Sequence, residues 1–61
     1  MRNLLIVCNP SREDAIAAAV ELQHSLASTF GIYTISDVEI SGIIRTAVDD
    51  LPDLEVAVVL G

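Results

Sequence analysis

NLLIVCN (residues 3–9) is followed directly by PSRED (residues 10–14), and this junction decides the fold. The five central residues of the first segment are apolar without alternation, which is typical of a strand buried on both faces of a parallel sheet. Pro10 lacks an amide hydrogen and disfavours helix in the residue before it. The strand is therefore predicted to end at Asn9, where a turn follows.

An amphipathic helix is predicted to follow the turn. Ser11 stands three residues before Asp14, close to a capping box, so the helix should begin near Arg12. Gly31 is expected to close it in a left-handed conformation. The apolar residues recur at a helical period on one face, which predicts that the helix covers a sheet; they are Ala15, Ile16, Ala19, Val20, Leu22, Leu26, Ala27 and Phe30.

The remaining half of the chain predicts two strands and a second helix. Residues 32–35 (IYTI) are rich in β-branched and aromatic side chains and predict a short strand. Residues 54–60 (LEVAVVL) end in an unbroken apolar run and predict a third, central strand. Between them lies another apolar stripe at helical spacing that predicts a shorter helix ended by Pro52; its residues are Ile40, Ile43, Ile44, Ala47, Val48 and Leu51.

Strands that alternate with amphipathic helices predict an α/β fold, here a three-layer β-α-β-α-β unit over residues 1–61 with a parallel sheet in the order 2-1-3. In such sheets ligands bind outside the carboxyl ends of the strands, where the strand order reverses. The sequence therefore predicts a site formed by the turn at Asn9 and Pro10 together with Gly61.

The chain is short and has few residues for covalent or metal cross-links. It has 61 residues, and a domain of this size buries only about 60% of the surface that its unfolded chain exposes. Cys8 is the only cysteine and His24 the only histidine, so neither an internal disulfide nor a zinc site is expected. The lone thiol, with no signal-peptide or membrane-spanning pattern, predicts a cytoplasmic protein without a membrane partner.

The charge excludes one class of partner. Three basic residues against nine acidic ones give a net charge of −6. A surface of this sign repels the phosphate backbone, so no nucleic-acid partner is expected. A nucleotide is still compatible with this charge, because backbone N–H groups at a helix N-terminus bind phosphate without lysine or arginine.

Each candidate site residue also has a purely structural interpretation. Asn9 and the first free N–H groups of the helix are placed to face a phosphate, yet Asn-Pro-Ser is also common in turns with a serine cap. Gly61 follows an apolar strand, where the lack of a Cβ permits either a close ligand approach or an ordinary tight turn. No G-x-G-x-x-G dinucleotide fingerprint is present.

The other chemically active residues are assigned to the surface or the core. Asp37 and Glu39 follow the second strand, where an acidic residue sometimes binds a ribose, but a solvated loop is the favoured interpretation. Asp49, Asp50, Asp53 and Glu55 cluster near the start of the third strand and are interpreted as solubilising charge. His24 is assigned to the surface and Cys8 to the core.

Two segments, LLIVCNPSREDAIAAAVELQHSL (residues 4–26) and DLEVAVVLG (residues 53–61), resemble the N-terminal part of bacterial NAD kinases, particularly the longer actinobacterial type. In that family the apolar strand that ends in V-L-G continues into a G-G-D-G loop, whose aspartate is catalytic. Gly61 matches the first glycine of this loop. The resemblance implies that the catalytic residue comes just after Gly61 and that residues 1–61 alone are inactive.

The activity that the resemblance implies is phosphorylation of the 2′-hydroxyl of the adenosine ribose of NAD to give NADP. ATP or polyphosphate would be the phosphoryl donor, with a divalent metal such as Mg²⁺, and the parent enzyme would be a homo-oligomer. Within this chain, Asn9, Pro10 and Gly61 would contribute to nucleotide binding. Lipid kinases of the diacylglycerol and sphingosine type share an Asn-Pro turn and a similar loop, so they are one alternative. A non-catalytic α/β binding module is the other.

Overall fold

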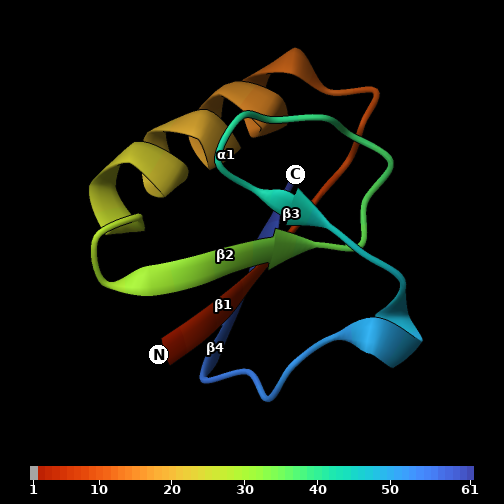
Figure 1. The fold of residues 1–61 in the computed structure, drawn as a ribbon. Coiled ribbons are helices and arrows are strands. Elements are labelled where there is room, and N and C mark those ends of the chain that lie inside the picture. Colours follow the sequence, from red (N-terminus) through yellow and green to blue (C-terminus); the bar gives the residue numbers. More distant parts are fainter. Residues whose placement is uncertain (1) are drawn as a thin grey trace.

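Four parallel strands form one sheet in the computed structural model, which describes residues 2–61 (Figure 1). The strands are β1 (Arg2–Cys8), β2 (Phe30–Thr34), β3 (Ile44–Arg45) and β4 (Val56–Leu60). One helix, α1 (Glu13–Leu26), connects β1 to β2, and a short 3₁₀ helix, η1 (Val48–Asp50), lies between β3 and β4. The predicted α/β class is confirmed.

The core lies between β1 and α1. Leu4, Ile6 and Cys8 alternate along β1 and are at most 4% exposed, so they share one face of the sheet. Ala15 and Ala19 of α1 are buried in the same cluster. Because both helix residues are alanines, the backbone of α1 lies close to the sheet. The unbroken apolar run of β1 is thus explained by its central place in the sheet.

The strand order is β3-β2-β1-β4, which differs from the predicted 2-1-3 because a fourth strand, β3, pairs with the outer side of β2. The order reverses between β1 and β4: the chain first moves from β1 toward β2 and β3, and then returns across the sheet to β4. Right-handed crossovers require that connections running in opposite directions lie on opposite faces. Figure 1 shows α1 on one side of the sheet and the return segment, residues 46–55, on the other.

The prediction of a second helix over residues 40–51 is wrong. Val38 is buried in the main core, and Ile40 and Ile43 pack against that core from an extended segment. Ile44 and Val48 of the same apolar stripe are instead 54% and 64% exposed, so the stripe does not form one buried face. Gly42 has a φ of +89°, which no α-helix accommodates. The neighbouring β-branched side chains also have low helix propensity, and Ile44 pairs with Tyr33 of β2 instead. The unit therefore lacks the second helix layer of the predicted three-layer arrangement.

Two expectations about the ends of α1 are also wrong. The residue before the first turn is Arg12, in an extended conformation, and no side chain caps the helix, so Ser11 does not serve as the cap. Gly31 lies inside β2 and not at the end of the helix. After Leu26 the chain turns through residues 27–29 and enters β2 at Phe30, which pairs with Arg2.

The return segment covers part of the second face of the sheet. Leu5 points to this face and is only 8% exposed. Asn3 holds the end of the segment at β1, because its carbonyl oxygen accepts a hydrogen bond from the Glu55 amide (2.9 Å) and its side-chain amide donates to the Asp53 carbonyl (3.1 Å). Among residues 2–61, no helix has the length and apolar character needed to cross a membrane.

Candidate functional site

The predicted site residues meet at the carboxyl edge of the sheet. Cys8 pairs with Leu60, so the residues that follow them, Asn9 and Gly61, leave the sheet side by side. This is the point at which the strand order reverses, where ligands bind in open α/β sheets. The structure thus brings Asn9, Pro10 and Gly61 together, next to the first turn of α1.

The turn at Asn9 is built around its own side chain. Asn9 Oδ1 accepts a hydrogen bond from the Ser11 amide (2.9 Å), and the Asn9 carbonyl oxygen accepts one from the Arg12 amide (3.1 Å). Pro10 occupies the second position of this turn, where its fixed φ is favourable. The carboxamide oxygen is therefore occupied by the turn, and the Asn9 amide NH₂ is the part of the side chain that remains for a ligand. Asn9 and Pro10 are both exposed.

Gly61 is confined by the first turn of α1. Its φ is +73°, a left-handed conformation that glycine adopts without steric cost. A Cβ at this position would lie 2.9 Å from the Cβ of Ala15, which is closer than two carbon atoms approach without repulsion. Gly61 is therefore required both by its backbone angle and by its distance from α1. It places a bare peptide group beside the N-terminus of a helix.

Arg12 also lies at this edge, beside Gly61, although the sequence analysis did not assign it to the site. Its Cδ and Nε lie 3.6 and 3.9 Å from the position that a Cβ of Gly61 would take. The guanidinium forms two hydrogen bonds to the Asp14 carboxylate, from Nε to Oδ1 (3.1 Å) and from Nη2 to Oδ2 (2.7 Å). A phosphate bound here would compete with Asp14 for Arg12. The two-residue spacing of these opposite charges was the only sequence signal for the pair.

The pairing predicts how Asp14 titrates. The hydrogen bonds from Arg12 lower the pKa of the Asp14 carboxyl below its ordinary value of 3.8. The ion pair with Arg12 therefore stabilises the fold above pH 3.8, where the Asp14 carboxyl is ionised. This stabilisation is lost as the pH falls through the lower pKa that Asp14 has in the folded state. We expect NMR titration of the carboxyl carbon to give a pKa below 3.8 in the wild type and a higher one in Arg12→Gln. Equal values in both would show that the ion pair does not persist in solution; Arg45→Gln is the matched control.

The end of β2 is tied to the same edge. The Cys8 amide donates a hydrogen bond to Ser36 Oγ (3.1 Å), and the Ser36 amide donates to Thr34 Oγ1 (3.0 Å). The Ser36 side chain thus connects the end of β1 to the loop that follows β2. Cys8 itself is 4% exposed, which confirms its assignment to the core.

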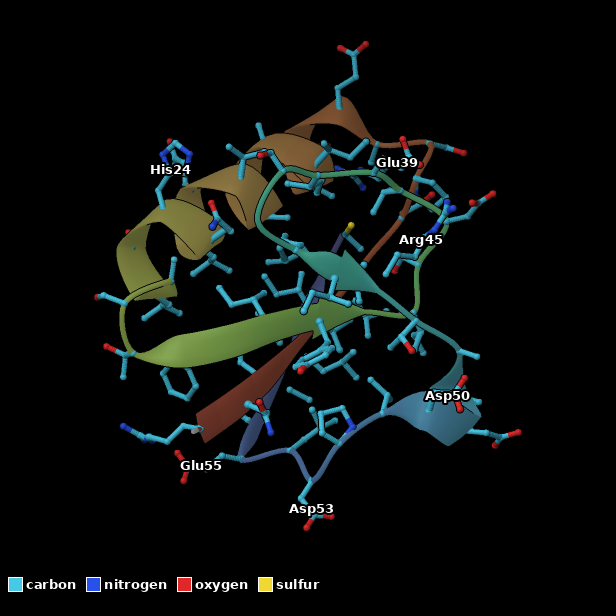
Figure 2. All side chains as sticks on the ribbon, in the orientation of Figure 1. His24, Glu39, Arg45, Asp50, Asp53 and Glu55 are labelled. Atoms are coloured by element: carbon cyan, nitrogen blue, oxygen red, sulfur yellow. The ribbon has the colours of Figure 1, made fainter. Side chains whose placement is uncertain are left out.

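The acidic residues after β2 are paired with Arg45 of β3. Arg45 Nη1 lies 3.0 Å from Asp37 Oδ1, and Nη2 lies 3.8 Å from Glu39 Oε1. An open depression of about 600 Å³ lies beside this cluster and not at Gly61; it is lined by Val38, Glu39, Ile40, Ser41, Ile43 and Arg45. Both carboxylates are largely exposed, in agreement with a solvated loop. Figure 2 shows Glu39 and Arg45 at the end of the molecule opposite Asp53 and Glu55.

The remaining charged residues lie away from the site. Asp49, Asp50, Asp53 and Glu55 are exposed, and Glu55 forms an ion pair with Arg2. His24 is exposed on α1 and points away from the sheet (Figure 2), as predicted. No group of three or more His, Cys, Asp or Glu side chains in residues 2–61 is arranged to hold a metal ion. We therefore assign no ligand of the implied divalent metal to this stretch.

Taken together, the carboxyl edge consists of the first turn of α1, the Asn9 amide side chain and an arginine that is ion-paired with Asp14. Such a surface suits a phosphate or another small anion, since oriented N–H groups at a helix N-terminus attract negative charge. Glu13 and Asp14 in the first turn of α1 limit that attraction. Among known proteins, no family model, curated protein or solved structure matches the chain.

Proposed function

We propose that this chain forms the N-terminal part of the nucleotide-binding domain of an NAD kinase, which transfers a phosphoryl group from ATP or polyphosphate to the ribose 2′-hydroxyl of NAD. The activity belongs to the complete enzyme, in the cytoplasm. Residues 1–61 supply one wall of the nucleotide site, at Asn9, Pro10 and Gly61.

The observation that carries the proposal is the placement of Gly61. It leaves β4 at the reversal of strand order, has a φ of +73° and packs against Ala15 at the first turn of α1. A glycine-rich phosphate loop needs this combination, because the backbone can then approach a phosphate with no side chain between them. The resemblance of residues 53–61 to the strand before a G-G-D-G loop supports the same assignment.

The chain's own part in such a reaction is positioning. Peptide N–H groups near Gly61 and the free amide of Asn9 would hold a phosphate in place, which is how much of phosphoryl-transfer catalysis is achieved. The group that accepts the proton of the attacking hydroxyl would come from the residues after Gly61. No step is assigned to a metal held by residues 2–61.

The test is to express the complete open reading frame and to supply it with NAD and either ATP or polyphosphate. NADP formation is followed with an NADP-specific dehydrogenase. We expect NADP to accumulate with at least one of the two donors, and the codons after Gly61 to encode G-D-G. The same protein should not phosphorylate diacylglycerol or sphingosine.

Two results would refute the proposal. Phosphorylation of a lipid without NADP formation would assign the chain to the diacylglycerol and sphingosine kinase class. A stop codon directly after Gly61, together with no kinase activity, would leave a non-catalytic binding module as the better interpretation.

A further inference from the structure

The open depression between the ends of β2 and β3 lies at the same edge of the sheet as Gly61. Its volume of about 600 Å³ falls within the range of small-molecule sites, about 300–1,000 Å³. Thr34, the last residue of β2, pairs with Arg45, the last residue of β3, so these two strands end together. Because all four strands are parallel, the depression opens at the carboxyl edge, where ligands of α/β sheets bind.

The depression combines apolar and polar walls. Val38 is buried, and Ile40 and Ile43 pack against the core, so these side chains form its inner part. Glu39 and Arg45 are exposed and form its outer part, on the same side of the molecule in Figure 2. Small-molecule sites commonly have this composition, in which aliphatic side chains contact a ring and a few polar groups fix its orientation.

The ion pairs of this loop leave the groups that a ring needs available. Arg45 donates from Nη1 to Asp37 (3.0 Å), which occupies an edge of the planar guanidinium and not the faces that stack on aromatic rings. The Glu39 carboxylate lies 3.8 Å from Arg45 Nη2, which is too far for a hydrogen bond. Its oxygens therefore remain acceptors for an amino group of a ligand.

Ser36 lies between the depression and the candidate nucleotide site. Its Oγ accepts a hydrogen bond from the Cys8 amide, while its hydroxyl hydrogen forms no hydrogen bond within residues 2–61. Ser36 lies on the β2 side of β1 and Gly61 on the β4 side, so they are about 10 Å apart, or two strand spacings. A phosphate bound between Asn9 and Gly61 places the ribose of a nucleotide near Ser36 and the base beyond it, in the depression.

We propose that the depression binds the adenine ring of the nucleotide whose phosphate lies at Gly61. The inference rests on the proposed nucleotide site and adds the position and the selectivity of the base. Adenine, the base that NAD and ATP share, stacks on the Arg45 guanidinium and contacts the isoleucine side chains, and its 6-amino group donates to Glu39. A base with a 6-oxo group places a carbonyl oxygen there instead, and the carboxylate repels it.

The test measures the binding of AMP and IMP to the product of the complete reading frame by isothermal titration calorimetry. The two nucleotides differ in the group at position 6 of the base. We expect AMP to bind at least about tenfold more tightly than IMP. In Glu39→Gln this ratio should fall to about threefold or less, because a glutamine amide both accepts from a 6-amino group and donates to a 6-oxo group. Glu21→Gln, at an exposed position of α1, is the matched control and should keep the wild-type ratio.

A second variant, Arg45→Lys, separates stacking from charge. Lysine retains the positive charge beside Asp37 but has no planar group, so AMP and IMP should both bind several-fold more weakly while their ratio stays unchanged. Circular dichroism checks that all variants keep the wild-type fold.

Undetectable binding of AMP to the wild type, or a ratio that Glu39→Gln does not alter, would overturn the inference. NADP formation without this dependence on Glu39 would overturn it and leave the kinase assignment intact. Binding of AMP that depends on Glu39, without NADP formation, would support the adenine site and refute only the kinase activity.

Discussion

Replacing Ile6 with alanine should abolish most of the stability of the fold. Ile6 lies at the centre of β1 and is completely buried between the sheet and α1. Truncation of a buried isoleucine to alanine costs about 2–5 kcal/mol, from lost burial and from the cavity that remains. A 61-residue chain has a total free energy of unfolding of roughly 3–9 kcal/mol, so this loss removes a large share of it.

Urea unfolding followed by circular dichroism measures the effect. The protein concentration is kept constant, because self-association would add to the apparent stability. Val48→Ala, at an exposed position on η1, is the control and should change the free energy of unfolding by less than about 0.5 kcal/mol. Equal midpoints for Ile6→Ala and Val48→Ala would mean that the core is not packed around β1.

The parts of the fold that were predicted correctly have patterns that only one structure satisfies. The apolar run of β1 ends at Pro10, which removes any alternative to a turn. The stripe of residues 15–26 keeps its helical period over more than three turns. The final run, β4, is too short and too rich in β-branched residues for a helix. In each case local propensity and tertiary packing favour the same conformation.

Residues 40–51 were predicted wrongly because two periods fit them. Their isoleucines recur at helical spacing, yet Gly42 lies in the middle and most neighbours are β-branched. The structure resolves the conflict through contacts that are distant in sequence: Ile44 pairs with Tyr33, and a Cβ at Gly42 would overlap the side chain of Gln23. Pairing with β2 stabilises an extended segment for which local propensity alone gives no clear preference.

The candidate site was predictable in its backbone and not in its side chains. The carboxyl ends of β1 and β4 must meet once both strands are parallel neighbours, which places Asn9 beside Gly61. That Asn9 uses its carboxamide oxygen within the turn, and that Arg12 lies against Gly61, depends on rotamers that no periodicity encodes. Both details change the expected chemistry, because one hydrogen-bond acceptor and one positive charge are already occupied.

Replacing Ala19 with leucine tests the close packing of α1 on which the position of Gly61 depends. Ala19 is completely buried against the sheet, and a larger side chain has no space there. Overpacking of this kind costs about 1–3 kcal/mol and displaces the backbone. The same substitution at Ala17, which is exposed on α1, is the matched control, since alanine and leucine have similar helix propensity.

We expect Ala19→Leu to lower the free energy of unfolding by this amount, and Ala17→Leu to leave it within about 0.5 kcal/mol of the wild type. The amide resonance of Gly61 should shift in Ala19→Leu and not in Ala17→Leu, because Gly61 contacts α1 one turn away, at Ala15. Identical unfolding curves and Gly61 shifts for the two variants would mean that α1 lies farther from the sheet. The distance to α1 would then no longer exclude a side chain at position 61, and only the φ of +73° would still favour glycine there. The argument for a phosphate-binding backbone held beside the helix N-terminus would be lost.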